Sequence, residues 1–139
     1  MLDLATLAVA ESAPIHLKGP DGAYLYSEGK PVRIHLSSPG SAAFAEVEDR
    51  QTARAVKLMQ DNDGKVAVAS KEQRDADAAA DLAALTVDIE NFKYGPAEGK
   101  IGKELFRAIY ADKKLGFITA QVTKALRDWG NFTLPSTEG

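Results

Sequence analysis

The stretch Val32-Arg33-Ile34-His35-Leu36, followed directly by Ser37-Ser38-Pro39-Gly40-Ser41, decides the fold. In its first half, apolar residues at 32, 34 and 36 alternate with polar residues at 33 and 35, which is the period-two pattern of a strand with one buried face. Its second half breaks the strand with proline and glycine and ends in a serine whose hydroxyl can cap a helix. A strand followed at once by a helix predicts a mixed fold.

Residues before this stretch predict partner strands. Pro14-Ile15-His16-Leu17-Lys18 alternates apolar and polar residues, and Ala23-Tyr24-Leu25-Tyr26 can extend again. Turn-forming residues separate these runs at Gly19-Pro20-Asp21-Gly22 and at Glu28-Gly29-Lys30-Pro31. We therefore expect a small antiparallel sheet over residues 13–37, preceded by an arm or short helix over residues 1–12.

After the sheet, apolar periodicity predicts helices over residues 41–130. The first spans Ser41 to Gln60 and ends at the turn Asp61-Asn62-Asp63-Gly64. The second spans Lys71 to Asn91, because apolar residues recur there every three or four positions: Ala78, Leu82, Leu85, Ile89 and Phe92. The third spans Lys103 to Ala111, and the fourth spans Leu115 to Trp129 with the stripe Leu115, Ile118, Val122, Ala125 and Trp129.

These elements predict an α+β fold in which a small N-terminal antiparallel β-sheet is followed by a helix-rich bundle of about four helices. The length fits one domain, over residues 1–132, with residues 133–139 as a flexible C-terminal tail. Alanine is dense over residues 76–84, and such small residues let helices approach closely. Both a tight intramolecular bundle and a helical dimer seam explain this density.

The 139 residues carry a net charge of −3, and the charge is unevenly distributed. Residues 1–92 hold nine Lys/Arg and fifteen Asp/Glu, whereas residues 93–127 hold eight and three. Nucleic acid and anionic membranes favour basic surfaces, so the overall charge argues against both as partners. The asymmetry can steer self-association or the binding of an acidic partner.

Residue types exclude several kinds of chemistry. The chain has no cysteine, which removes disulfides, thiolate metal sites and cysteine nucleophiles. No apolar run reaches the ~18 to 20 residues of a membrane helix. Asp3 stands where a secretory signal would carry a positive charge, so we expect no such signal.

Three motif-like strings do not meet the requirements of the sites they imitate. Gly95-Pro96-Ala97-Glu98-Gly99-Lys100 has too few residues between its glycines for a phosphate loop, and its proline removes an amide donor. The turn at residues 61–64 lacks the carboxylates that a calcium loop needs at its two ends. His16 and His35 lie on strands expected to pair, but no third metal ligand is evident. We therefore expect a non-enzymatic protein without catalytic residues, cofactor or metal.

Two parts of the chain resemble tail assembly chaperones of long-tailed bacteriophages and prophages. The first is the strand and helix start over residues 29–41. The second comprises Leu85-Thr86-Val87-Asp88-Ile89-Glu90-Asn91-Phe92-Lys93-Tyr94, the run over residues 108–122 and the ending Gly130-Asn131-Phe132. The resemblance covers about residues 29–132, and Ile89 stands where the family often has tryptophan.

The resemblance implies a non-catalytic protein of the host bacterial cytoplasm. Such chaperones bind the long tape measure protein and keep it soluble until tail-tube subunits polymerise around it. The tape measure protein is therefore the expected partner, the major tail protein is a second one, and a homo-oligomer is a further expectation. Family members are often also made as a longer product by a translational frameshift near the C-terminus.

Covering the apolar stripe of a helical partner calls for a groove between helices, which we expect between the last two. The expected apolar contacts are Phe106, Tyr110, Phe117 and Ile118, and the expected basic rim is Lys103, Arg107, Lys113 and Lys114. The alternative for each of these residues is an ordinary core position or a solvated helix face.

Two other classes of protein compete with the chaperone. A structural tail-completion or connector protein would also be small and catalytically empty, but it would remain in the virion. A small enzyme using His16 and His35 is a third class, for which the sequence suggests no substrate.

Overall fold

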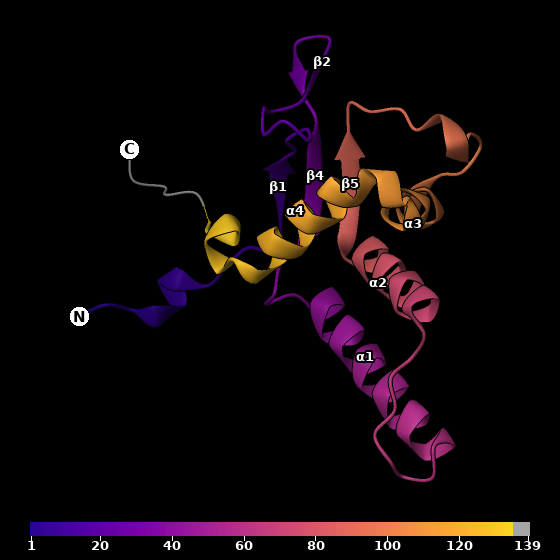
Figure 1. Cartoon of the computed structure of the whole chain (residues 1–139). Coiled ribbons are helices and arrows are strands. Elements are labelled where there is room, and N and C mark those ends of the chain that lie inside the picture. The colour runs from indigo at the N-terminus through magenta and orange to yellow at the C-terminus, as the bar shows by residue number, and fades with distance from the viewer. Residues whose placement is uncertain (135–139) are drawn as a thin grey trace.

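The structure, a computed structural model, describes residues 1–134 and has the α+β architecture expected from the sequence. Within these residues, four α-helices accompany a three-stranded antiparallel sheet of order β1-β4-β5 (Figure 1). The strands are β1 (Ser12–His16), β2 (Tyr26–Ser27), β3 (Lys30–Pro31), β4 (Arg33–Ser37) and β5 (Thr86–Glu90). The helices are α1 (Ala42–Asp61), α2 (Lys71–Leu85), α3 (Gly102–Ala111) and α4 (Gly116–Arg127), with short 3-10 turns η1 (Leu4–Leu7), η2 (Gly95–Ala97), η3 (Lys113–Leu115) and η4 (Trp129–Phe132).

The predicted N-terminal sheet is confirmed, and β4 is its central strand. β1 pairs with β4 in antiparallel register from Ser12 opposite Ser37 to His16 opposite Arg33, while β2 and β3 form a separate short hairpin. Ile34 and Leu36 are fully buried, whereas Arg33 and His35 lie on the opposite, partly exposed face. The alternation in the sequence therefore separates a core face from an outer face as expected.

The predicted first helix is confirmed at both ends. The Ser41 hydroxyl oxygen accepts a hydrogen bond of 3.2 Å from the amide of Phe44, so this serine is the N-cap of α1. At the other end, the amide of Gly64 donates to the carbonyl of Met59 over 2.9 Å, and Gly64 has φ +79°. A positive φ is a conformation that glycine adopts without steric cost, so this turn ends the helix where the sequence predicts.

The prediction of one helix from Lys71 to Asn91 is wrong in its last third. α2 ends at Leu85, and Thr86–Glu90 form β5, which pairs with β4. Ile89 falls on the core side in either conformation, so the apolar spacing does not distinguish a helix from a strand here. Thr86, Val87 and Ile89 are β-branched, which favours a strand, and pairing with β4 gives this strand its backbone hydrogen bonds.

The predicted fourth helix is too long at its C-terminal end. α4 stops at Arg127, and the Asp128 carboxylate then accepts a hydrogen bond from the amide of Gly130, starting η4. Trp129, expected on the buried stripe, is 54% exposed, and Phe132 is buried in its place with no exposed surface. The side-chain cap thus turns the chain before tryptophan reaches the core.

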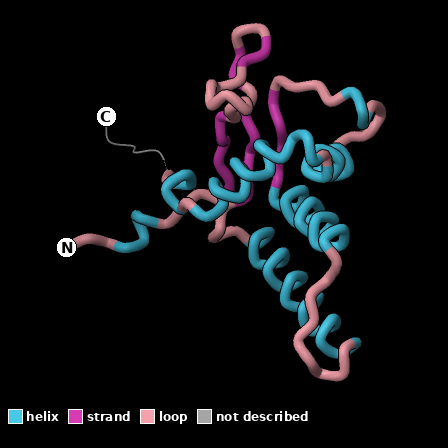
Figure 2. Tube along the Cα trace, viewed as in Figure 1, coloured by secondary structure: helices cyan, strands magenta, loops and turns pink. Residues whose placement is uncertain are grey.

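The helices are distributed unevenly around the sheet. α4 crosses the sheet and α3 lies beside β5, whereas α1 extends away from the rest of the molecule (Figure 1). The loop over residues 62–70 returns from the far end of α1 to α2 (Figure 2). The N-terminal arm with η1 also projects, and its Leu2, Leu4 and Leu7 are largely exposed.

A single hydrophobic core joins the two halves of the chain. It includes residues of the sheet, of all four α-helices and of η4, from Leu17 to Phe132. This core unites residues far apart in sequence, and the single domain over residues 1–132 stays a prediction. Of the predicted tail over residues 133–139, all but Thr133 and Leu134 lie outside the described residues.

Candidate partner-binding pocket

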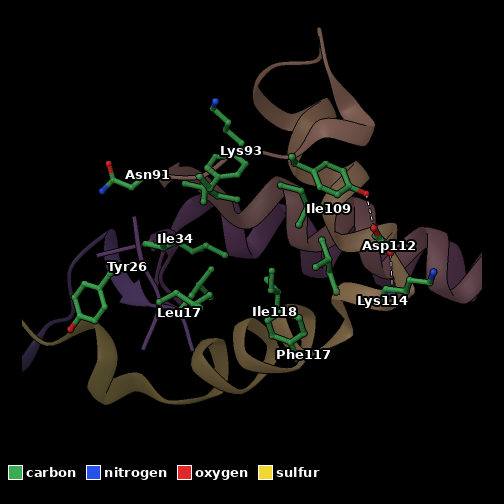
Figure 3. A pocket seen from close by; sticks show the side chains of 16 residues that line it. Leu17, Tyr26, Ile34, Asn91, Lys93, Ile109, Asp112, Lys114, Phe117 and Ile118 are labelled. Carbon is green, nitrogen blue, oxygen red and sulfur yellow. Dashed lines mark hydrogen bonds between the residues drawn. The ribbon is translucent and has the colours of Figure 1, made fainter. Parts of the chain in front are cut away.

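The main candidate site is an apolar pocket of about 410 Å³ between the sheet and the helices, called here the sheet–helix pocket. Its floor is the core-facing side of β4 and β5 with neighbouring residues, and its walls come from the β5–α3 connection, the end of α3 and the start of α4 (Figure 3). The lining residues are mostly aliphatic or aromatic: Leu17, Leu25, Tyr26, Val32, Ile34, Ile89, Asn91, Phe92, Lys93, Tyr94, Ile109, Asp112, Lys114, Leu115, Phe117 and Ile118. Pockets of this size and composition bind apolar groups.

Hydrogen bonds around Asp112 hold the helical wall in place. The Tyr94 hydroxyl donates to one carboxylate oxygen of Asp112 over 2.8 Å, and the amide of Lys114 donates to the other over 3.0 Å. The first bond ties the β5–α3 connection to the turn η3, and the second caps that turn. The hydrogen bond to Asp112, with help from desolvation, raises the pKa of the Tyr94 phenol. η3 then leads directly into α4, which presents Phe117 and Ile118 to the pocket.

The charged groups at the pocket are mostly basic. Lys93 and Lys114 are exposed residues at the periphery of the apolar lining, on different sides of it (Figure 3). Asp112 already accepts the two hydrogen bonds described above. Among the ion pairs of residues 1–134, none involves either lysine. The pocket therefore combines an apolar floor with a basic edge.

The structure brings together only three of the eight predicted contact residues in this pocket. Lys114, Phe117 and Ile118 line it. Tyr110 and Lys113 instead border a second groove, of about 610 Å³, between α2 and the α3–α4 corner. The predicted groove between the last two helices is thus corrected to a pocket between those helices and the sheet.

Two predicted apolar contacts belong to the core. Phe106 is 5% exposed and Tyr110 is 6% exposed, so neither offers appreciable surface to a partner. The Tyr110 hydroxyl lies 2.6 Å from the hydroxyl oxygen of Thr86, which itself donates to the carbonyl of Leu82. Burial raises the pKa of Tyr110 to about 12. Tyr110 therefore serves to join α3 to the α2–β5 junction.

Two predicted rim cations also lie away from the pocket. The Lys103 ammonium donates to the carbonyls of Ala84 and Thr86 at 3.2 and 2.5 Å, so it satisfies acceptors at the end of α2. Desolvation there lowers the pKa of Lys103. Arg107 is exposed on α3 and does not border the pocket. Of the four cations of the predicted basic rim, only Lys114 lines the sheet–helix pocket, and Lys113 borders the second groove.

Sequence reasoning missed the floor of the pocket. Leu17, Val32 and Ile34 come from the N-terminal third, and Ile89 comes from a segment predicted to be helical. The alternation over residues 32–36 marks the first group as buried, but it carries no information on which helices cover that face. Phe92 and Tyr94 gave the clearest available signal, since these two aromatic residues begin the connection between β5 and α3.

The two histidines do not form a joint site. The Nε2 atom of His16 is 2.8 Å from the carbonyl oxygen of Leu25, and its ring stacks on Tyr24. His35 hydrogen-bonds to Glu90, and this bond, together with that from Arg33, lowers the pKa of the Glu90 carboxyl. Within residues 1–134 no group of three or more potential metal-ligating side chains was found.

Comparisons with protein-family models, with curated proteins and with solved structures found no match to this chain. In the part of the chain that the structure describes, none of the helices has the length and apolar character required to cross a membrane.

Proposed function

We propose that this chain is a tail assembly chaperone of a long-tailed bacteriophage or prophage. In this role it acts in the host bacterial cytoplasm, where it binds the tape measure protein and keeps it soluble before tail-tube polymerisation. The identity of the partner rests on the resemblance over residues 29–132. The observation that carries a binding role is the sheet–helix pocket, whose apolar lining includes the partly exposed Leu25, Phe92, Phe117 and Ile118.

The pocket suits the physical problem that a tape measure protein poses. A long helical chain with an exposed apolar stripe aggregates unless that stripe is covered. An amphipathic helix can place its apolar side chains into a hydrophobic groove, as in other helix-in-groove complexes. Phe117 and Ile118 on one wall, with Phe92 on another, are partly exposed and provide complementary apolar contacts. Many copies of a small chaperone along a long partner would cover the stripe repeatedly, which fits the proposed homo-oligomer.

One structural feature favours the alternative, a tail-completion or connector protein that stays in the virion. The projecting arm exposes 70% of Leu2, 74% of Leu4 and 61% of Leu7. An apolar arm of this kind suits a permanent contact with a neighbouring subunit, including the major tail protein. Mass spectrometry of purified particles separates the two roles, because a chaperone leaves the tail before it is complete.

Co-expression with the long, largely helical protein encoded immediately downstream tests the chaperone role. We expect the partner to be soluble and to co-purify only when this chain is present. Phe117→Asp places a charge in the pocket and should abolish co-purification, whereas Val56→Asp, on the exposed part of α1, should leave it intact. A partner that is soluble alone and is not retained, together with this chain in purified virions, would contradict the proposal.

A further inference from the structure

The backbone around the sheet–helix pocket restricts what kind of segment can occupy it. The floor is the face of β4, whose two edges already pair with β1 and β5. An occupant that lies over this face, and not along the outer edge of β5, meets side chains and adds no strand to the sheet. Its own backbone N–H and C=O groups must then be satisfied internally, which a helix does.

The volume of the pocket sets how much of a helix can enter. A cavity of ~150 Å³ is large enough to hold benzene. The 410 Å³ of this pocket therefore accommodates on the order of two large apolar side chains. Residues at i and i+4 of a helix project side by side from one face and can enter such a pocket together.

The charges around the pocket select the residues that flank this apolar pair. Lys93 and Lys114 lie on different sides of the lining, and their ammonium groups point away from its centre (Figure 3). The Asp112 carboxylate is held by Tyr94 and by the amide of Lys114. An occupant with carboxylates on both sides of its apolar pair would meet both lysines, whereas a single-headed amphiphile such as a fatty acid would meet only one.

We propose that the sheet–helix pocket recognises an acidic amphipathic helix of the partner protein. The helix carries two bulky apolar residues at i and i+4, with Asp or Glu about one turn before and one turn after them. Lys93 and Lys114 select the flanking carboxylates, and the partly exposed apolar walls of the pocket bind the pair. This inference rests on the proposed function, since it specifies which segments of the partner the chaperone covers.

Synthetic helical peptides of about 20 residues test this recognition directly. One peptide carries Phe and Leu at i and i+4 with flanking Glu, and the second has the same sequence with flanking Lys. We expect the Glu peptide to bind the full-length chain at least tenfold more tightly at low salt, by fluorescence anisotropy. The advantage should shrink as salt is added, because exposed charges are screened over ~8 Å at 0.15 M.

A charge-swap variant distinguishes recognition by Lys93 and Lys114 from a general effect of the net charge. The double variant Lys93→Glu/Lys114→Glu should reverse the preference toward the Lys peptide, and both positions are exposed, so the fold should persist. Lys124→Glu is the matched control, because it makes the same kind of change on an exposed residue of α4 outside this pocket. Its affinities should stay within twofold of those of the unmodified chain.

Several outcomes would overturn the inference. These are equal binding of the two peptides, a Lys124→Glu effect as large as that of the double variant, or binding of oleate without binding of either peptide. Competition with the co-purified partner separates this inference from the proposed function. If the Glu peptide binds but the tape measure protein does not, the recognition stands and the assigned partner is wrong. If the tape measure protein binds and the peptide does not displace it, the chaperone role stands and the inference fails.

Discussion

At the residue scale, buried polar groups connect elements that the sequence leaves separate. Asp81 on α2 is 6% exposed and accepts hydrogen bonds from Arg54 at 2.5 and 2.9 Å and from Gln51 at 3.1 Å. Both donors lie on α1, and Val47 is the only residue of this described helix that is buried. The orientation of α1 therefore depends on a polar contact as much as on apolar packing. The sequence shows these residues as ordinary polar positions of two helices.

Replacing Asp81 should lower stability in a pH-dependent way. Desolvation acts to raise the pKa of Asp81, but its hydrogen bonds to Arg54 and Gln51 and the nearby positive charges outweigh it, so the net pKa is below the ordinary 3.8. A lowered carboxyl pKa stabilises the folded state at pH values above 3.8, and this stabilisation is lost as the pH falls through the lowered value. We expect Asp81→Asn to reduce the free energy of unfolding by about 2 kcal/mol at pH 7. Urea titrations between pH 7 and pH 2 should show the difference from the unmodified chain closing below pH 4. A constant difference would contradict this account.

Two buried residues of β4 should differ in how much their truncation costs. Ile34 and Leu36 have no exposed surface, but only Ile34 borders the sheet–helix pocket. Truncation of a buried Leu or Ile to Ala costs about 2 to 5 kcal/mol, depending on how completely its surroundings are packed. We expect Ile34→Ala near the lower end of that range and Leu36→Ala at least about 1 kcal/mol above it. Urea unfolding measures both, and equal losses would mean that the pocket leaves the packing of Ile34 complete.

At the element scale, the α2–β5 junction and the far end of α1 show how tertiary contacts act on local preferences. α2 passes into β5 without an intervening residue, and the junction is held by the Thr86–Tyr110 and Lys103–Thr86 contacts. Beyond Arg54, the end of α1 has little such support, since Val56 is 48% exposed and Met59 is 43% exposed. Helices gain most of their stability from packing of one face, so we expect this end of α1 to be less stable than the other α-helical segments.

Amide hydrogen exchange should divide α1 into two parts. Amides over residues 45–51, near Val47 and the contact with Asp81, should be protected to nearly the same extent as those of α2. Amides over residues 55–61 should exchange at least tenfold faster, because local fraying exposes them without breaking the core. The Asp81→Asn variant should extend fast exchange toward residue 51. Uniform protection along α1 would contradict this division and would indicate a partner on its exposed face.

At the scale of the whole molecule, an acidic and a basic segment of the sequence share one hydrophobic core. The acidic and basic surfaces therefore belong to the same folded unit. Residues 1–92 carry most of the acidic groups and residues 93–127 most of the basic ones. The basic segment provides α3, α4 and part of the pocket edge, whereas the acidic segment includes α1 and α2. Attraction between the basic face of one copy and the acidic face of another is a physical route to the proposed homo-oligomer.

Self-association by this route should be sensitive to salt. We expect light scattering to show a mass above that of the 14.9 kDa monomer at low ionic strength, falling toward the monomer as salt rises to about 0.5 M. Exposed charges interact over ~30 Å at 0.01 M salt but over only a few ångströms at high salt, so attraction between copies weakens strongly as salt is added. An oligomer that persists at high salt would point instead to apolar contacts, such as those of the exposed arm leucines.

The sequence by itself determined the α+β class, the strand and helix start over residues 32–41, and the limits of α1. These features depend on local chemistry: alternation of apolar side chains, a capping hydroxyl, and turn residues that allow positive φ. The tertiary structure decided the conformation of Thr86–Glu90, because pairing with the open edge of β4 favours an extended segment over a continuation of α2. It also decided the candidate site, since Ile34, Ile89 and Phe117 are far apart in the chain and meet only when the helices pack against the sheet.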